Sequence, residues 1–251
     1  RKLHSEALAL LNRIVQDKLL QARAVFGFFN ANASNSDDVV VSSGENGENP
    51  VVLNFLRQQN KKAKGLPNYS LSDFIVPESE GKSDYIGAFV VSCGFGADKL
   101  ARHYEDELDD YNSIMVKALA DRLAEAFAEY LHERVRKEFW GYAKTENFDN
   151  KDLIGEKYIG IRPAPGYPAC PDHLEKRKLF DLLDAEKAIG VTLTESFAMN
   201  PAASVSGWYF ANDQSKYFGL GKIARDQVED YARRKQMKVE EVERWLAPVL
   251  A

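Results

Sequence analysis

The sequence predicts an α+β fold: a single twisted, mostly antiparallel sheet bracketed by helices, one of them long. Two observations lead to this prediction. The segments with strand character lie in hairpin-like pairs or late in the chain, so they do not alternate regularly with helices as a doubly wound fold requires. A helical pattern over about 111–139 is long enough to cover such a sheet. No segment has the composition of an interdomain linker, so we expect residues 1–251 to form one domain.

The first half of the chain predicts one helix followed by strands. Leu3 to Leu20 carries apolar residues at helical spacing. Apolar runs predict strands over 24–29, 39–41, 51–55 and 85–91. Residues 31–38 are polar and turn-rich, and the loop before residue 51 contains Asn46-Gly47, which favours a hairpin. Tyr85–Val91 is apolar throughout and is expected near the middle of the sheet.

The long helix follows a glycine loop and a capping residue. Gly94-Phe95-Gly96 leads into a helix from about Ala97, but Lys99 stands at the third glycine position of a dinucleotide fingerprint, which argues against such a site. Asp109 or Asp110 can cap the long helix. Its apolar residues should face the sheet, namely Val116, Leu119, Leu123, Phe127, Tyr130 and Leu131. Its polar residues should lie roughly on the opposite side, namely Asp121, Glu125, Glu129 and His132.

The remaining elements follow a proline-rich segment. A helix is predicted over 174–189, ended by Gly190. Strands are predicted over 191–197, 205–210 and 216–220, and helices over 226–234 and 239–246.

Composition narrows the class of protein. The net charge of −5 argues against nucleic acid as the main partner, and no apolar run reaches the ~18 residues of a membrane span. Two cysteines far apart in sequence, Cys93 and Cys170, fit a reducing cytoplasm. The sequence contains no histidine and cysteine cluster with metal-ligand spacing. Arg1 enters a helical pattern directly, without an initiator methionine, so we expect an excised fragment.

The segment Arg162–His173 is the clearest functional candidate. Four of the nine prolines fall within residues 163–171, which predicts a stiff, extended loop. Arg162 offers a planar fork of donors that suits a carboxylate. Gly166 allows close approach to the backbone, and Tyr167 adds an aromatic face and a hydroxyl. These groups suit a small zwitterion with an aromatic part, although a proline-rich turn between helices explains the same residues.

This segment, with Asp109-Asp110-Tyr111-Asn112 before it and Ser206-Gly207-Trp208-Tyr209-Phe210 after it, resembles the C-terminal activation domain of cobalamin-dependent methionine synthase. The resemblance extends to Trp245-Leu246-Ala247-Pro248, and the family fold agrees with the one predicted above. It implies a domain that binds S-adenosylmethionine and supports reductive methylation of inactive cob(II)alamin. Cobalamin is then held by the cobalamin-binding domain of the same polypeptide, and flavodoxin or an equivalent reductase supplies the electron.

The resemblance also implies a set of ligand contacts. Arg162 is expected to bind the carboxylate, the Ala164 and Gly166 backbone and Tyr167 to line the pocket, and Tyr217 and Phe218 to form a second contact segment; Glu125 and Glu156 are further candidates near the ammonium. From the residues alone, Tyr217 and Phe218 also fit ordinary core aromatics, and Glu125 fits a solvated helix face. The family carries an Asp-Trp-x-Pro-Phe-Phe motif upstream of Arg1, so we expect these 251 residues to bind the ligand weakly.

Two alternatives remain at this point, namely an independent S-adenosylmethionine-dependent methyltransferase and a module that only docks flavodoxin and the cobalamin domain. Flavodoxins are acidic, and so is this chain, so docking needs a local basic patch. We expect it at Lys61, Lys62 and Lys64, or otherwise at Arg233, Arg234 and Lys235.

Overall fold

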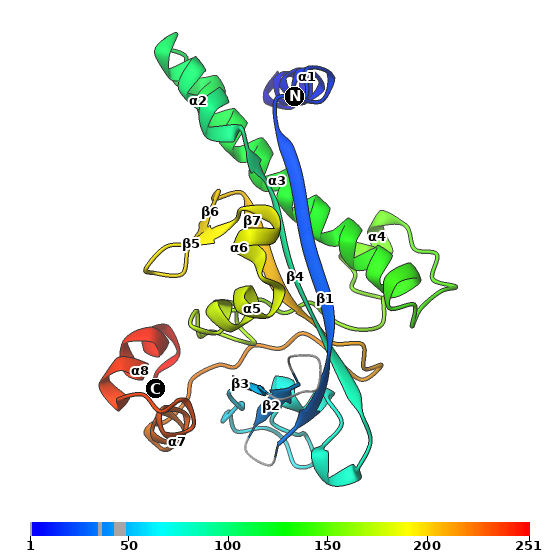
Figure 1. The fold of residues 1–251 in the computed structure, drawn as a ribbon, viewed down its shortest axis with the longest axis vertical. Coiled ribbons are helices and arrows are strands. Elements are labelled where there is room, and N and C mark those ends of the chain that lie inside the picture. The colour runs from blue at the N-terminus through cyan, green and yellow to red at the C-terminus, as the bar shows by residue number, and fades with distance from the viewer. Residues whose placement is uncertain (1, 35–36, 43–48) are drawn as a thin grey trace.

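The fold is built on two long strands that run side by side through the molecule (Figure 1). The computed structural model describes residues 2–34, 37–42 and 49–251, and the predicted Asn46-Gly47 turn lies outside them. Within this range a five-stranded antiparallel sheet has the order β3-β2-β1-β4-β7. Its strands are β1 (Gln21–Ala33), β2 (Asp38–Val41), β3 (Val51–Asn54), β4 (Asp84–Phe95) and β7 (Ser204–Tyr209). A separate small hairpin pairs β5 (Thr192–Leu193) with β6 (Met199–Asn200).

Strand β4 confirms the prediction that the most apolar segment is internal. It lies between β1 and β7, and every residue from Ile86 to Gly94 is buried. Strand β1 is longer than the predicted 24–29, because its pairing continues into a polar segment that we expected to be a turn. The Asn32 side chain satisfies its donors there by hydrogen bonds to the carbonyls of Val76 and Lys82.

The helices confirm most of the predicted elements. They are α1 (Lys2–Gln16), α2 (Ala97–Asp106), α3 (Asp110–Arg134), α4 (Asn150–Ile154), α5 (Glu175–Leu183), α6 (Ala185–Ile189), α7 (Arg225–Lys235) and α8 (Val239–Leu246). A π-helical turn, Val135–Phe139, continues α3 to the predicted end, and Asp109 caps its start by accepting from Asn112 N at 3.0 Å. The predicted helix over 174–189 is instead two helices, because Asp184 adopts a left-handed conformation (φ 47°).

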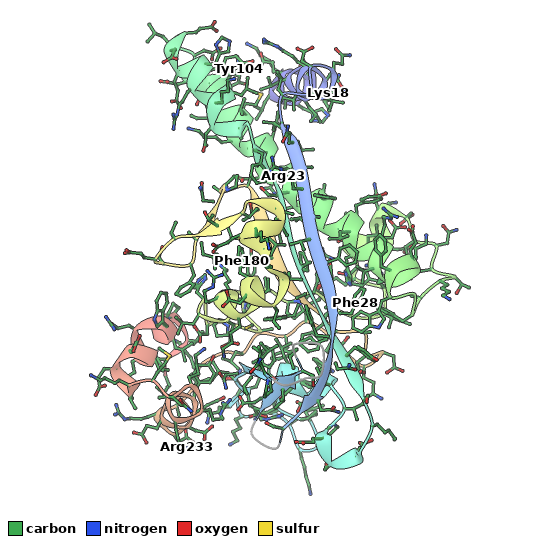
Figure 2. All side chains as sticks on the ribbon, viewed as in Figure 1. Lys18, Arg23, Phe28, Tyr104, Phe180 and Arg233 are labelled. Carbon is green, nitrogen blue, oxygen red and sulfur yellow. The ribbon has the colours of Figure 1, made fainter. Side chains whose placement is uncertain are left out.

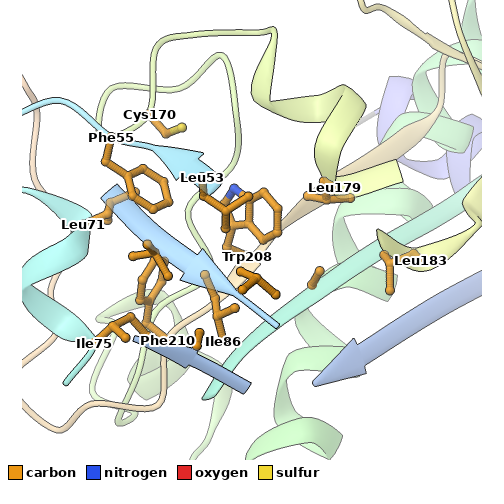
Figure 3. Close-up of a cluster of buried hydrophobic side chains, with 14 of the residues drawn as sticks. Leu53, Phe55, Leu71, Ile75, Ile86, Cys170, Leu179, Leu183, Trp208 and Phe210 are labelled. Carbon is orange, nitrogen blue, oxygen red and sulfur yellow. The ribbon is translucent and has the colours of Figure 1, made fainter. Parts of the chain in front are cut away.

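Helices cover both faces of the sheet, as predicted. Alternate residues of β4 point to opposite sides: Ile86, Ala88 and Val90 pack with α5 and α6, whereas Phe89 and Val91 pack with α3. In Figure 1, α3 runs diagonally behind β1 and β4. Figure 3 shows the opposite core, where Trp208 of the sheet lies beside Leu179 of α5. Helices α7 and α8 pack together at the chain's C-terminal end.

The face that α3 presents to the sheet differs from the predicted one. Fully buried small residues, Ala120, Ala124 and Ala128, form its centre, whereas Tyr130 is 55% exposed. His132 continues this buried row, although the sequence placed it on the polar face. Small side chains allow a helix to pack closely against its neighbours, which here are α1, α2 and the sheet.

We expect this close contact to be sensitive to added volume. Ala120→Leu inserts three carbon atoms into a packed interface and should lower the free energy of unfolding by about 1–3 kcal/mol. Ala118→Leu, at an exposed position two residues earlier, should change it by less than about 0.5 kcal/mol. Urea denaturation of both variants measures the difference. Equal free energies of unfolding for the two variants would contradict the close packing at Ala120.

Candidate functional site

The proline segment begins as an extension of the sheet. Ile161 and Phe210 exchange two backbone hydrogen bonds of 3.0 Å, and Trp208 N donates to the Pro163 carbonyl at 2.9 Å. A β-carbon at Gly207 would lie 2.8 Å from that carbonyl, so the close approach requires glycine there. The loop is therefore stiff because its first residues are paired to β7 as well as because of its prolines.

A cavity of about 530 Å³ lies between this loop, α3 and the segment around Tyr217. It contains seven of the eight predicted site residues: Arg162, Ala164, Tyr167, Tyr217, Phe218, Glu125 and Glu156. Pro163, Pro168 and Ala169 of the proline segment also line it. The sequence did not indicate the other lining residues, which are Phe89, Tyr158, Val205 and Gly219. Phe89 and Val205 are apolar strand residues, and nothing in their sequence context separates them from the core.

Gly166 is the predicted site residue that does not line the cavity. Its φ is +93°, and a β-carbon would lie 2.1 Å from the His173 ring. Its N–H donates to the Cys170 carbonyl at 2.7 Å and closes the turn. The conformation of the loop itself therefore requires glycine at this position.

The predicted strand over 216–220 is wrong, because this segment is irregular. It crosses the proline loop: Leu220 N donates to the Pro168 carbonyl at 2.8 Å, and the Tyr217 hydroxyl accepts from Arg162 N at 3.0 Å. Pairing with the loop replaces pairing within the sheet. As a result, the two contact segments expected from the resemblance form adjacent walls of one cavity.

The Arg162 guanidinium is held by three groups at the cavity wall. Its Nη1 atom lies 3.0 Å from His132 Nδ1 and 3.3 Å from the Tyr158 hydroxyl oxygen. Its Nη2 atom donates to a Glu129 carboxylate oxygen at 2.5 Å. A guanidinium has five N–H donors. Among the described residues, Nε has no acceptor and Nη2 has Glu129 alone, so the guanidinium retains donors that suit a carboxylate.

His132 is the site residue that sequence periodicity misplaced. It is fully buried, stacked on Tyr209 (ring centroids 5.1 Å apart, 16° between planes) and edge-on to Tyr158. Burial, together with the positive charges of Arg136 and Arg162, lowers the pKa of His132 well below its ordinary value. The imidazole is therefore neutral near pH 7.

Two carboxylates complete the charges around the cavity. Glu125 lies on α3, four residues before Glu129, and Glu156 follows α4 in a left-handed conformation (φ 52°) that a non-glycine residue adopts only at some cost. With Arg162 they give the cavity one cationic and two acidic groups among aromatic walls. Such a set can bind a zwitterion with an aromatic part.

The two predicted basic patches differ in accessibility. Arg234 is buried and paired with Asp38, and Lys235 is buried against Asp172 at 2.8 Å and against Glu175. Their positive charges are therefore paired inside the fold, and Arg233 is the residue of the second patch whose side chain points outward (Figure 2). Lys61 and Lys64 of the first patch are exposed.

The described residues, 2–34, 37–42 and 49–251, contain no group of three His, Cys, Asp or Glu residues placed to hold a metal ion. In the same residues, every helix is too short or too polar to cross a bilayer.

Comparisons with known proteins point to one family. Residues 1–236 match the family model of the activation domain of vitamin B12-dependent methionine synthase. Among solved structures, the crystal structure of the MetH reactivation domain bound to AdoHcy (S-adenosylhomocysteine) is similar, with a TM-score of 0.94 and 56% sequence identity. The match covers 100% of this chain and 77% of that chain. Both comparisons confirm the resemblance carried by the proline loop.

The buried neutral His132 predicts a pH-dependent stability. The unfolded chain binds a proton at this histidine below about pH 6.5, whereas the folded chain does not, so the free energy of unfolding falls as the pH decreases. From pH 6.5 to 5.5 the wild-type protein should lose roughly 1 kcal/mol more stability than His132→Asn. Denaturation at several pH values measures this difference.

The matched control for this experiment is His4→Asn, at an exposed position in α1. Its stability should follow the wild-type pH dependence. Parallel curves of unfolding free energy against pH for the wild type and His132→Asn would contradict the prediction. They would mean that the imidazole is protonated in the folded chain as readily as in the unfolded chain.

Proposed function

Since the chain belongs to the family of activation domains of vitamin B12-dependent methionine synthase, we propose that it binds S-adenosylmethionine in the cavity beside Arg162. In this proposal the domain presents the methyl donor during reductive reactivation of the parent enzyme. Cobalamin, held by the cobalamin-binding domain of the same polypeptide, is the methyl acceptor, and flavodoxin or an equivalent reductase supplies the electron. The chain contributes binding and orientation of the donor, which is catalysis by proximity, rather than a complete active site of its own.

The observation that carries the proposal is that Arg162, which has no acceptor at Nε among the described residues, lines a cavity with two carboxylates and aromatic walls. S-adenosylmethionine has a carboxylate, an ammonium, a sulfonium and an adenine ring. The Nε and Nη2 donors of Arg162 match the carboxylate in a bidentate geometry, and Glu125 and Glu156 match the cationic groups. Tyr217 and Phe218 offer faces on which the adenine ring can stack. The cavity volume is in the range typical of small-molecule sites.

An independent methyltransferase is less well supported. Every pair of strands within the described five-stranded sheet is antiparallel, so this sheet lacks the parallel βαβ unit on which nucleotide loops are built. Methyl transfer to an added acceptor in the absence of cobalamin would favour this alternative.

The two cysteines, Cys93 and Cys170, are free and buried, which supports a cytoplasmic location within the proposal.

The role of Arg162 can be tested in the complete enzyme. Arg162→Ala should weaken S-adenosylmethionine binding tenfold to a hundredfold, because a charge-assisted hydrogen-bonded pair contributes about 1.5–3 kcal/mol. Arg162→Lys should restore only part of the affinity, since an ammonium cannot form the fork. Calorimetric titration measures the affinities, and turnover with methyltetrahydrofolate should remain nearly unchanged.

A suitable control is Arg177→Ala, which removes a half-buried arginine paired with Asp181 and Glu186. It should leave the affinity at the wild-type value. An Arg162→Ala enzyme that folds normally and binds as tightly as the wild type would remove Arg162 from the binding site.

The reductase surface is proposed at Lys61 and Lys64, next to Lys62. The Lys62 ammonium lies 5.0 Å from the centre of the Tyr69 ring, and that ring packs against Phe218 of the cavity wall. The basic surface is therefore connected to the proposed ligand site by two aromatic rings. An acidic reductase docked there would be adjacent to the cavity.

Charge reversal tests this surface. Lys61→Glu with Lys64→Glu should slow flavodoxin-dependent reactivation about tenfold at low ionic strength, and the effect should shrink as salt screens the charges. Arg233→Glu, on the exposed side of α7, is the matched control and should have little effect. Reactivation rates that do not respond to the double reversal at low salt would exclude this surface.

A further inference from the structure

Helix α3 carries a row of polar residues that are more buried than the sequence suggests. Glu129, His132 and Arg136 follow each other at helical spacing and share one side of the helix. The first two contact the Arg162 guanidinium directly. Arg136 lies deeper, in the π-helical turn, and is fully buried. Together they connect the cavity wall to the interior of the fold.

The Arg162–His132 contact fixes the state of the imidazole. A guanidinium is always charged and can only donate, so His132 Nδ1 must accept and cannot carry a proton. The neutral ring then has its proton on Nε2, which is buried and has no hydrogen-bond partner among the described residues. Protonation of Nδ1 would remove the acceptor and would place a second positive charge against Arg162. The geometry thus requires one tautomer of a neutral histidine.

A second layer holds the groups that surround His132. Arg136 donates to both carboxylate oxygens of Glu146 in a buried ion pair, with side-chain exposures of 0% and 5%. Its guanidinium lies over the Tyr158 ring at 4.3 Å from the ring centre. Tyr158 and Tyr209 pack on two sides of the imidazole. The ring of His132 therefore has no freedom to turn away from Arg162.

We propose that His132 is a positioning residue for ligand binding: it holds the Arg162 guanidinium so that its Nε and Nη2 donors remain directed at the cavity. This inference rests on the proposed function, since the ligand is taken to be one with a carboxylate. His132 does not line the cavity, so its effect on binding is transmitted through Arg162. Tyr158 and Glu129 fix the other two contacts, and His132 provides the contact that lies deepest in the protein.

The test compares two ligands in the complete enzyme by calorimetric titration. S-adenosylhomocysteine carries the carboxylate, whereas 5′-methylthioadenosine has the same adenosyl group and sulfur without it. His132→Phe keeps a flat ring against Tyr209 and removes the acceptor. It should weaken S-adenosylhomocysteine binding about tenfold, the size of one charge-assisted hydrogen bond, and 5′-methylthioadenosine binding less than twofold.

Two further variants separate positioning from general damage. His132→Asn places an amide oxygen near the position of Nδ1 and should bind S-adenosylhomocysteine within about threefold of the wild type. In an Arg162→Ala background, His132→Phe should add less than a twofold loss, because the group that it positions is gone. Equal losses for both ligands, or a full tenfold loss in the Arg162→Ala background, would overturn the positioning role.

A measurement on the unmodified protein covers the case in which His132→Phe does not fold. Long-range ¹H–¹⁵N spectra of the 251-residue chain report which ring nitrogen of His132 carries the proton. We expect a protonated Nε2 and an unprotonated Nδ1 at pH 7, and a ring protonated on Nδ1 would overturn the inference. Failure of the wild-type enzyme to bind S-adenosylhomocysteine would overturn the proposed function and the positioning role with it. Wild-type binding with unselective losses would overturn the positioning role alone.

Discussion

The pairing of Ile161 with Phe210 is the contact on which the site depends. Neighbouring residues of an extended strand point to opposite faces. Ile161 enters the core beneath α5, together with Phe210, so Arg162 must point to the face covered by α3, where Tyr209 also lies. A shift of one residue in this short ladder would place the arginine in the apolar core. These two backbone hydrogen bonds therefore place the Arg162 guanidinium on the side of the sheet that α3 covers, where the cavity lies.

How much of this structure the sequence predicts depends on the kind of signal. Helix α8 and strand β4 were predicted well because their apolar patterns reflect burial alone, on one side of α8 and on both faces of β4. Part of the cavity wall was predicted because the proline loop resembles a known family, although periodicity alone also allowed core aromatics at Tyr217 and Phe218. Residues 216–220 were misjudged because a strand-like composition also suits an irregular segment whose hydrogen bonds go to a loop. Local propensity does not reveal which partner a backbone will find.

Buried charges were the least predictable feature. Arg136, Arg234 and Lys235 are ordinary surface residues by composition, but each is enclosed with a carboxylate: Arg136 with Glu146 ten residues later, and Arg234 and Lys235 with Asp38 and Asp172 from distant parts of the chain. Such pairs contribute little net stability relative to apolar residues of the same volume, yet a single missing partner leaves a costly unpaired charge. Here they fix α7 against the proline loop and the end of α3 against Tyr158. Their pattern is visible only once the tertiary neighbours are known.

The arginine clamp has a consequence for the thermodynamics of recognition. A free arginine side chain loses up to about 2 kcal/mol of rotamer entropy when it becomes ordered. In this protein Glu129, His132 and Tyr158 order Arg162 when the chain folds, so association with a ligand does not include that loss. Affinity at the cavity is thereby linked to the rigidity of α3 and its π-helical turn. A change that loosens this helix far from the cavity would weaken binding even though every residue of the cavity wall is intact.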